Sequence, residues 1–105
     1  MRNRDMLINK KIAIVTGANK GIGKTIAIKL SNQGIFVIGT STSKVGVKKI
    51  NNQLKNKGKG MLLNITNYEH VTQTIKNIYK EFNSIDILVN NAGINKDNFL
   101  LLMST

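Results

Sequence analysis

The sequence predicts an α/β fold in which a doubly wound parallel sheet carries helices on both faces. Short runs of β-branched and other apolar residues alternate with longer segments whose apolar residues recur at helical spacing. Loops of a few residues join them, as in sheets built from parallel strands and crossover helices. The order is β-α-β-α-β-α-β, and an apolar run follows it. We therefore expect a sheet that is truncated after its fourth strand.

Four apolar runs predict the strands. "KIAIV" and "IFVIG" are short and rich in β-branched residues, which suits strands buried on both faces. "MLL" and "IDILV" have the same character and follow the second and third helical segments. We expect strand four to present a long apolar edge, which would make the chain alone poorly stable and prone to aggregation. The expected strands span residues 11–15, 35–39, 61–63 and 85–89.

Three segments of helical periodicity lie between these strands. Gly34 follows the first segment, where a helix commonly ends in a left-handed residue. Ser43 can cap the second segment and Gly58 and Gly60 can end it, while Thr66 or Asn67 can cap the third. The expected helices span residues 21–33, 43–57 and 67–82.

Composition limits the class of protein. A chain of 105 residues with 41% hydrophobic residues can form one small domain or part of a larger one. Cysteine is absent, which excludes disulfides and cysteine-ligated metal, and we expect no metal site. The sequence has no apolar run of membrane-spanning length and no signal-peptide h-region. The expectation is a soluble, cytoplasmic protein without a membrane partner.

The formal charge of +11 raises the question of nucleic acid. The lysines are scattered along the chain, and aromatic residues make up only 5%. A nucleic-acid site more typically clusters basic residues with aromatic ones. We therefore interpret the charge as compositional drift on a solvated surface and expect no nucleic-acid partner. Nucleic-acid binding and weak attraction to an acidic partner are alternative hypotheses, and an affinity that does not change with salt would exclude both.

The stretch "TGANKGIGKT", residues 16–25, fits two phosphate-binding patterns. From Gly17 it is a glycine-rich dinucleotide-binding turn. From Ala18 it is a relaxed P-loop that ends in Gly23, Lys24 and Thr25. Both patterns aim backbone N–H groups at the N-terminus of a helix toward a phosphate. The motif by itself does not decide between a nicotinamide enzyme and a nucleoside triphosphatase.

The residues after the third and fourth strands favour the dinucleotide. A P-loop enzyme needs a carboxylate at the end of a neighbouring strand to organise Mg²⁺. Here the third strand is followed by Asn64, and the fourth by Asn90 and Asn91. Asp86 lies at the opposite end of the fourth strand. We therefore interpret the P-loop match as a coincidence.

The end of the second strand bears on which nicotinamide cofactor is bound. NAD sites usually place an Asp or Glu there to bond the ribose 2′-hydroxyl. This strand ends in "GTSTS", where the hydroxyls of Thr40, Ser41 and Thr42 could bond a 2′-phosphate. Lys20, in the glycine loop, adds positive charge. These residues favour NADPH over NAD, with a solvated Lys20 and hydroxyls engaged in turns as the alternative interpretation.

"TGANKGIG" after strand one and "NNAG" after strand four together resemble the short-chain dehydrogenase/reductase family, which has both motifs at these strand ends. Further stretches, "VIGTSTS", "GKGMLLNIT" and "EFNSIDILVNNAGINKDNFLLLM", are similar to its bacterial 3-oxoacyl-[acyl-carrier-protein] reductase branch. The resemblance runs from residue 11 to residue 103. It implies a Rossmann-type sheet and NADPH. For the full-length enzyme it also implies an acyl carrier protein substrate and a homo-oligomer, a tetramer.

The resemblance also implies a division of the chain and a set of cofactor-binding residues. Residues 1–10 are an N-terminal extension, and residues 11–105 are the N-terminal half of an NADPH-binding Rossmann domain. The glycine loop is expected to wrap the phosphates, Thr42 to approach the 2′-phosphate, and the residues after strand three to flank the adenine. Asn90 is expected to be mainly structural, and Asn91 to bond both backbone and cofactor. The implied cofactor-binding residues are Gly17, Ala18, Asn19, Lys20, Gly21, Gly23, Thr42, Asn64, Ile65, Asn91 and Gly93.

No catalytic residue is assigned. The family is expected to protonate its substrate with a tyrosine, assisted by a lysine four residues later, a serine and an asparagine. Tyr68 and Tyr79 have no lysine at that spacing. All four groups are therefore expected beyond residue 105, and the chain alone is expected to be inactive. The alternatives are an inactive nucleotide-binding or interaction half-domain, and a short-chain reductase of another ketone.

Overall fold

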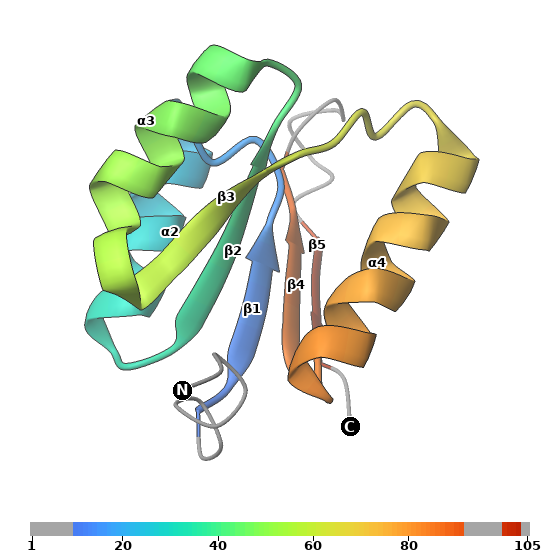
Figure 1. The fold of residues 1–105 in the computed structure, drawn as a ribbon. Helices are drawn as coiled ribbons and strands as arrows, with labels where there is room; N and C mark the ends of the chain where they lie inside the picture. Colours follow the sequence, from blue (N-terminus) through green and yellow to red (C-terminus); the bar gives the residue numbers. More distant parts are fainter. Residues whose placement is uncertain (1–9, 92–99, 104–105) are drawn as a thin grey trace.

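The computed structural model describes residues 10–91 and the backbone of residues 100–103. Most of the proposed N-terminal extension lies outside these residues. The strands are β1 (Ile12–Val15), β2 (Phe36–Ser41), β3 (Gly58–Leu62), β4 (Ile87–Asn90) and β5 (Leu100–Met103). They form one sheet in the order β3-β2-β1-β4-β5 (Figure 1). The first four strands are parallel. The predicted α/β fold with its parallel sheet is confirmed.

Three α-helices cover the two faces of this sheet. They are α2 (Gly21–Asn32), α3 (Lys44–Leu54) and α4 (Tyr68–Phe82), and a 3₁₀ turn, η1 (Lys55–Lys57), follows α3. Figure 1 shows α2 and α3 together on one face and α4 alone on the other. The chain moves one way across the sheet from β1 to β3 and the other way from β3 to β4. Right-handed crossovers then require the two directions of travel to use opposite faces.

Alternate residues of β1 serve two cores. Ala13 and Val15 pack on the α2–α3 side, in a cluster that includes Ile50 of α3. Ile14 packs on the other side, with Ile78 of α4. Because side chains alternate along a strand, one short apolar run supplies both faces of the sheet. This explains why β1 consists of apolar residues alone.

The ends of the helices carry the expected signals. Gly34, after α2, has φ of +86°, in the left-handed region. Ser43 Oγ accepts a hydrogen bond of 3.0 Å from the Gly46 N–H and so caps α3. Asn67 Oδ1 accepts one of the same length from the His70 N–H and caps α4. No helix within the described ranges has the length and apolarity that crossing a membrane requires.

The boundary between α3 and β3 differs from the expected one. The helix ends at Leu54, and Lys55 follows with φ of +52°. Gly58 and Gly60, expected to end the helix, lie instead in β3, of which Gly58 is the first residue. A Cβ on Gly58 would lie 2.2 Å from the carbonyl oxygen of Val37. The glycine is therefore needed for the close approach of two strands and not for a helix end.

β5 corrects the expectation that strand four is an open edge. It pairs antiparallel with β4, with Ile87 opposite Met103 and Asn90 opposite Leu100. An unpaired strand edge presents N–H and C=O groups that attract another strand. The apolar run near residue 100 satisfies these groups of β4. The exposed strand-four edge was our reason to expect poor stability, and because β5 covers that edge this reason no longer holds.

Asp86 fastens the start of β1 to the start of β4. Its Oδ2 accepts hydrogen bonds from the buried Ile12 N–H at 2.8 Å and from the Ser84 hydroxyl at 3.3 Å. We predict that Asp86→Ala lowers the free energy of unfolding by about 1–3 kcal/mol, because the Ile12 N–H loses its acceptor. Asp86→Asn, which keeps an acceptor oxygen, should cost less. Urea denaturation followed by circular dichroism measures both, and an alanine variant as stable as the parent would contradict the prediction.

Candidate functional site

A cavity of about 620 Å³ opens at the carboxyl edge of the parallel strands. Parallel sheets of this kind bind ligands at that edge, at the point where the strand order reverses. Here the reversal falls at β1, because β2 follows on one side of it and β4 lies on the other. The lining residues come from the ends of β1, β2, β3 and β4. They are Gly17, Asn19, Lys20, Gly21, Thr40, Ser41, Thr42, Ser43, Leu63 and Asn91.

The loop between β1 and α2 forms one wall of this cavity. Gly17 and Gly21 have φ of +63° and +62°, which other residues rarely adopt. A Cβ on Gly21 would meet no atom within 4 Å, so the backbone here is open to a ligand. Lys20, the N-cap residue of α2, makes no side-chain capping bond, and the first turn holds no acidic residue. The N–H groups and the positive dipole end of α2 are thus available to an anion.

Gly23 lets α2 approach the glycine loop. A Cβ at this position would lie 2.1 Å from the carbonyl oxygen of Gly17 and 2.7 Å from Asn91 Nδ2. Side chains essentially never approach backbone this closely, so no other residue fits without movement. Gly23 itself is buried. It therefore shapes the site without lining the cavity.

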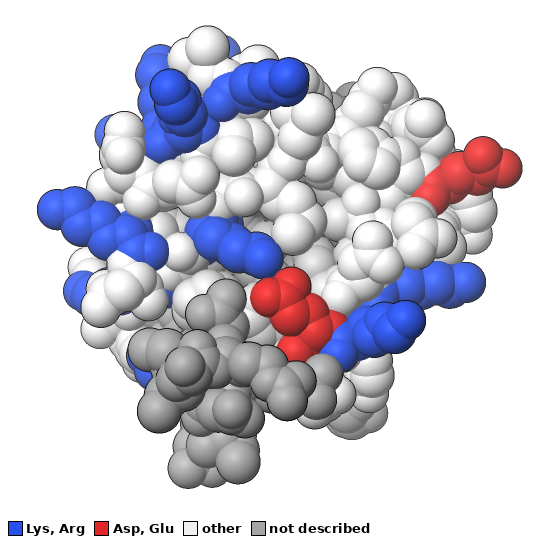
Figure 2. All heavy atoms as spheres, viewed as in Figure 1, with Lys and Arg blue, Asp and Glu red and all other residues white. Residues whose placement is uncertain are grey.

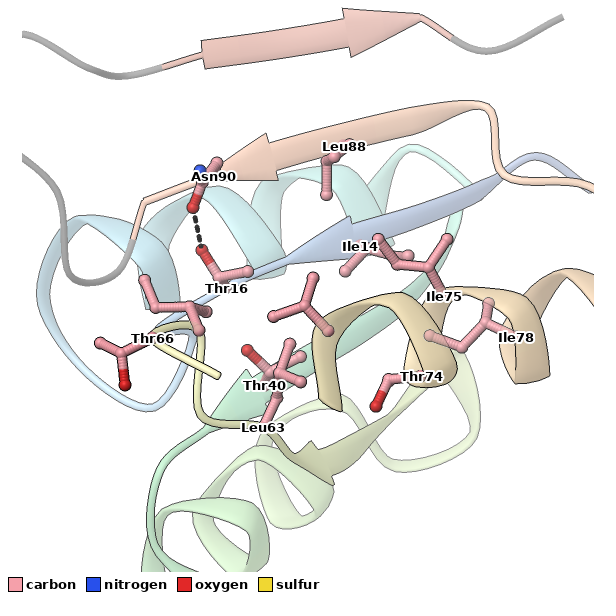
Figure 3. Close-up of a pocket in the computed structure, with 12 residues that line it drawn as sticks. Ile14, Thr16, Thr40, Leu63, Thr66, Thr74, Ile75, Ile78, Leu88 and Asn90 are labelled. Carbon is pink, nitrogen blue, oxygen red and sulfur yellow. Dashed lines mark hydrogen bonds between the residues drawn. The ribbon is translucent and has the colours of Figure 1, made fainter. Parts of the chain in front are cut away.

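Thr16 joins the glycine loop to the residues after β4. Its hydroxyl accepts a hydrogen bond of 2.7 Å from the Asn91 N–H and donates to Asn90 Oδ1 at 3.2 Å (Figure 3). The Thr16 N–H donates to the Val89 carbonyl at 3.0 Å. Asn91 Nδ2 lies 3.4 Å from the Gly17 carbonyl oxygen, to which it donates. The two sequence motifs are thus parts of one hydrogen-bonded unit, in which Asn91 also lines the cavity.

The end of β2 forms the opposite wall and carries hydroxyl groups. Thr40 is 1% exposed, and its carbonyl accepts from the Ala18 N–H at 3.0 Å, which holds the glycine loop against β2. Ser41 Oγ accepts from the Ser43 N–H at 3.3 Å and fixes the turn into α3. Thr42, between them, is exposed. This wall therefore carries the exposed hydroxyl of Thr42 beside the buried side chains of Thr40 and Ser41.

The surroundings of the cavity are cationic. No described residue that lines it is acidic, and the chain has neither Asp nor Glu from residue 6 to residue 68. The acidic residues that the structure describes are Glu69 and Glu81 on α4 and Asp86 before β4. Figure 2 shows basic side chains over the α2–α3 side without acidic ones among them, whereas on the α4 side basic and acidic side chains both occur. A polyanionic ligand would meet favourable potential on entering the cavity.

The structure brings together six of the predicted cofactor residues on the cavity wall and places the others differently. Ala18 and Gly23 are buried behind the wall. Asn64 is exposed, and its Oδ1 accepts from the N–H and the hydroxyl of Thr66 at 3.0 Å and 2.7 Å. Ile65 lines a neighbouring cavity. Gly93 lies outside the described residues. The six on the wall are Gly17, Asn19, Lys20, Gly21, Thr42 and Asn91.

The neighbouring cavity, of about 240 Å³, lies between the sheet and α4 (Figure 3). Its deep part is apolar, with Ile14 and Leu88 from the sheet facing Ile78 of α4. Thr40 and Leu63 line both cavities. The two cavities therefore adjoin at the ends of β2 and β3. A ligand bound in the polar cavity could place a flat apolar group in the apolar one.

Sequence reasoning missed several residues that build the site. Leu63, 4% exposed, lines both cavities, although alternation along "MLLN" could have indicated an inward side chain. Thr16 was matched as a motif residue but was given no role. Gly46 gave no signal, because its importance arises from close packing against Ser41 and Asn19. Their residue types are common in strands, turns and helix ends, so the sequence alone does not mark them as part of a site.

Comparison with known proteins agrees with this geometry. The family model of the short chain dehydrogenases matches residues 11–105. The chain is 54% identical over 100 residues to the 3-oxoacyl-[acyl-carrier-protein] reductase FabG of Buchnera aphidicola subsp. Acyrthosiphon pisum, covering 95% of this chain and 41% of that protein. It is 52% identical over 93 residues to the reductase of the same name from Haemophilus influenzae, covering 89% of this chain and 38% of that protein.

A third relative, the FabG reductase of Vibrio cholerae, is 51% identical over 98 residues, with 93% of this chain and 40% of that protein covered. The chain thus spans about two fifths of the length of the curated relatives it matches. Residues of the glycine motif and Asn91 of "NNAG", on which the family resemblance rests, line the cavity. The chain belongs to the short-chain dehydrogenase family of oxidoreductases.

Proposed function

We propose that the chain is the NADPH-binding part of a 3-oxoacyl-[acyl-carrier-protein] reductase, an enzyme that reduces 3-oxoacyl groups to 3-hydroxyacyl groups during fatty-acid elongation. The observation that carries the proposal is the cavity at the carboxyl edge. It combines an open glycine-rich helix N-terminus with a wall of hydroxyls, a lysine and no carboxylate. The names of the similar reductases support the substrate class.

The glycine loop fits the pyrophosphate of a dinucleotide. Gly17, Asn19 and Gly21 line the cavity, and the backbone at Gly21 has open space beside it. The N-terminus of α2 supplies N–H groups and a positive dipole end for the phosphate charge. Ala18 and Gly23 hold this loop against β2 and α2 from behind. In our proposal these two residues act through the shape of the loop.

The second wall fits a 2′-phosphate. Lys20 and Thr42 are exposed on opposite sides of the cavity and carry a charge and a hydroxyl that can bind a phosphate. The end of β2 has Thr40 and Ser41 and lacks the Asp or Glu that typically bonds the ribose 2′-hydroxyl of NAD. NADPH is therefore the cofactor that we propose.

The remaining predicted residues are proposed to hold the two ends of the cofactor. Ile65 lines the apolar cavity that adjoins the polar one, which suits the adenine ring, with Asn64 at its exposed rim. Asn91 lines the main cavity beside the glycine loop, where it can bond a ribose. The role of Gly93, on the path to the nicotinamide, stays a prediction from the family motif.

The bound cofactor supplies a hydride, and the residues of this chain bind and orient it. Protonation of the forming alkoxide needs a positioned acid. We propose that the family's tyrosine, lysine, serine and asparagine belong to sequence beyond residue 105, so that the 105-residue chain binds NADPH without reducing a ketone. An acyl carrier protein substrate, a homotetramer and a cytoplasmic location are proposed for the whole enzyme.

Fluorescence titration of the 105-residue chain with NADPH, and with NADH as control, tests this proposal. We expect saturable binding with NADPH preferred by at least about tenfold, since a phosphate paired with a lysine and a hydroxyl contributes more than 1.4 kcal/mol. A second sample is a chimera in which residues 11–105 replace the matching segment of the Buchnera aphidicola reductase. A chimera that reduces a 3-oxoacyl thioester with NADH as well as with NADPH would contradict the cofactor assignment.

A further inference from the structure

We propose that Gly46 is a positioning residue for the 2′-phosphate end of the cofactor site. It acts by allowing the first turn of α3 to pack directly against Ser41 and Asn19. This inference rests on the proposed function, because it concerns how the same cavity distinguishes NADPH from NADH. No sequence motif singles out this glycine, and its φ does not require one.

The close packing around Gly46 carries the proposal. Gly46 is buried in the first turn of α3, and its N–H is held by Ser43 Oγ at 3.0 Å. A Cβ on this residue would lie 2.0 Å from Ser41 Oγ, 2.7 Å from Ser41 Cβ and 3.2 Å from Asn19 Cγ. The first two distances are far inside ordinary contact, so an alanine at this position must push the helix or its neighbours away.

Both neighbours of Gly46 belong to the cavity. Ser41 ends β2, and Asn19 lies in the glycine loop, and each lines the 620 Å³ cavity from a different wall. The first turn of α3 is thus wedged between the two walls. Their separation at this corner is set by a residue that has no side chain. A Cβ on Gly46 would thus meet residues of both walls at once.

The chain connection makes the corner sensitive. Only Thr42 and Ser43 separate the end of β2 from α3, and the Ser43 N–H is tied to Ser41 Oγ at 3.3 Å. A displacement of the first turn of α3 therefore moves the Thr42 hydroxyl and breaks the Ser41–Ser43 bond. The N-terminus of α2 at Gly21 has no such connection to α3. We infer that a Cβ at Gly46 disturbs the 2′-phosphate corner more than the pyrophosphate loop.

Gly46→Ala tests the inference through the ratio of two affinities. We expect NADPH binding to weaken by about tenfold or more and NADH binding by about threefold at most, because a misplacement of an ångström commonly costs this much in a positioned site. Gly58→Ala is the matched control for overpacking: its Cβ would lie 2.2 Å from the Val37 carbonyl oxygen and 2.8 Å from Leu54 Cδ1, at the end of α3 remote from the cavity. It should leave the NADPH-to-NADH ratio unchanged.

A rescue separates positioning from general damage. In Gly46→Ala combined with Ser41→Gly, the two shortest contacts disappear, and the NADPH preference should return to that of Ser41→Gly alone. The same variants are made in the chimera, where the ratio of kcat/KM values for the two cofactors replaces the ratio of affinities, so that a variant unstable in the short chain is still scored. An unchanged ratio in folded Gly46→Ala would overturn the inference. A parent chain without NADPH preference would instead overturn the proposed function.

Discussion

Replacing Gly23 by alanine is expected to lower the free energy of unfolding by about 3 kcal/mol and to abolish NADPH binding, since overpacking against backbone cannot be relieved by a rotamer change. The new Cβ would lie 2.1 Å from the Gly17 carbonyl oxygen and 2.7 Å from Asn91 Nδ2. To make room, α2 must move away from the loop or Gly17 must abandon its left-handed conformation. Either change dismantles the wall that we propose holds the pyrophosphate.

Gly34→Ala is the control for this prediction. Gly34 has φ of +86°, but a Cβ there would meet no atom within 4 Å. The substitution adds backbone strain of about 1–2 kcal/mol and no overlap. Gly34 is also at the opposite end of α2 from the cavity. Its NADPH affinity should equal that of the parent.

Urea denaturation and NADPH titration of both variants, in the chain and in the chimera, give the comparison. The free energy of unfolding should be highest for the parent chain, lower for Gly34→Ala and lowest for Gly23→Ala. If Gly23→Ala bound NADPH as tightly as Gly34→Ala, the loop would not depend on the close approach of α2, and our account of Gly23 would be wrong.

The elements that were predicted correctly are those whose signals are local. β-branched runs at regular spacing gave the parallel strands, and Gly34 and Ser43 marked helix ends through their own backbone or side-chain chemistry. The errors concern residues whose role depends on a distant partner. Gly58 resembled a helix terminator, yet it is glycine because Val37 of β2 lies 2.2 Å from where its Cβ would be.

β5 is the clearest example of information that local patterns lack. Its pairing with β4 joins residues separated by ten or more positions in the chain, and an apolar run of four residues is compatible with helix or strand. The side chains of Ile22 and Tyr79 make a related point. Helical spacing places both on apolar faces, but they are 67% and 50% exposed. Periodicity gives the direction of a side chain, whereas burial depends on what packs over it.

The sequence also predicted only part of the candidate site. The glycine motif and Asn91 of "NNAG" identified residues that line the cavity, because glycine-rich phosphate loops have strong backbone requirements. They did not distinguish residues that line the cavity from residues that support it. Ala18 and Gly23 turned out to lie behind the wall, and Leu63 to lie on it. That distinction depends on a few ångströms of packing depth, which sequence patterns do not report.

Thr42→Asp is expected to weaken NADPH binding by about 10- to 100-fold and NADH binding by less than about threefold, because a carboxylate near a 2′-phosphate adds repulsion of about 1.4–3 kcal/mol. Thr42 is exposed on the cavity wall, so the substitution adds charge without disturbing the core. Thr42→Asn, of the same shape without the charge, should lose only the hydroxyl contribution.

The salt dependence of this variant then identifies the cause. Repulsion between the carboxylate and the phosphate is screened by salt, so the NADPH penalty of Thr42→Asp should shrink between low and high ionic strength, while that of Thr42→Asn stays constant. Titrations with 2′,5′-ADP and 5′-AMP repeat the comparison without the nicotinamide. If Thr42→Asp weakened the binding of both nucleotides equally, the 2′-phosphate would bind elsewhere. The proposal that Lys20 and Thr42 bind it together would then be wrong. A selective loss for 2′,5′-ADP would locate cofactor discrimination at the turn between β2 and α3, the turn that Gly46 holds in place.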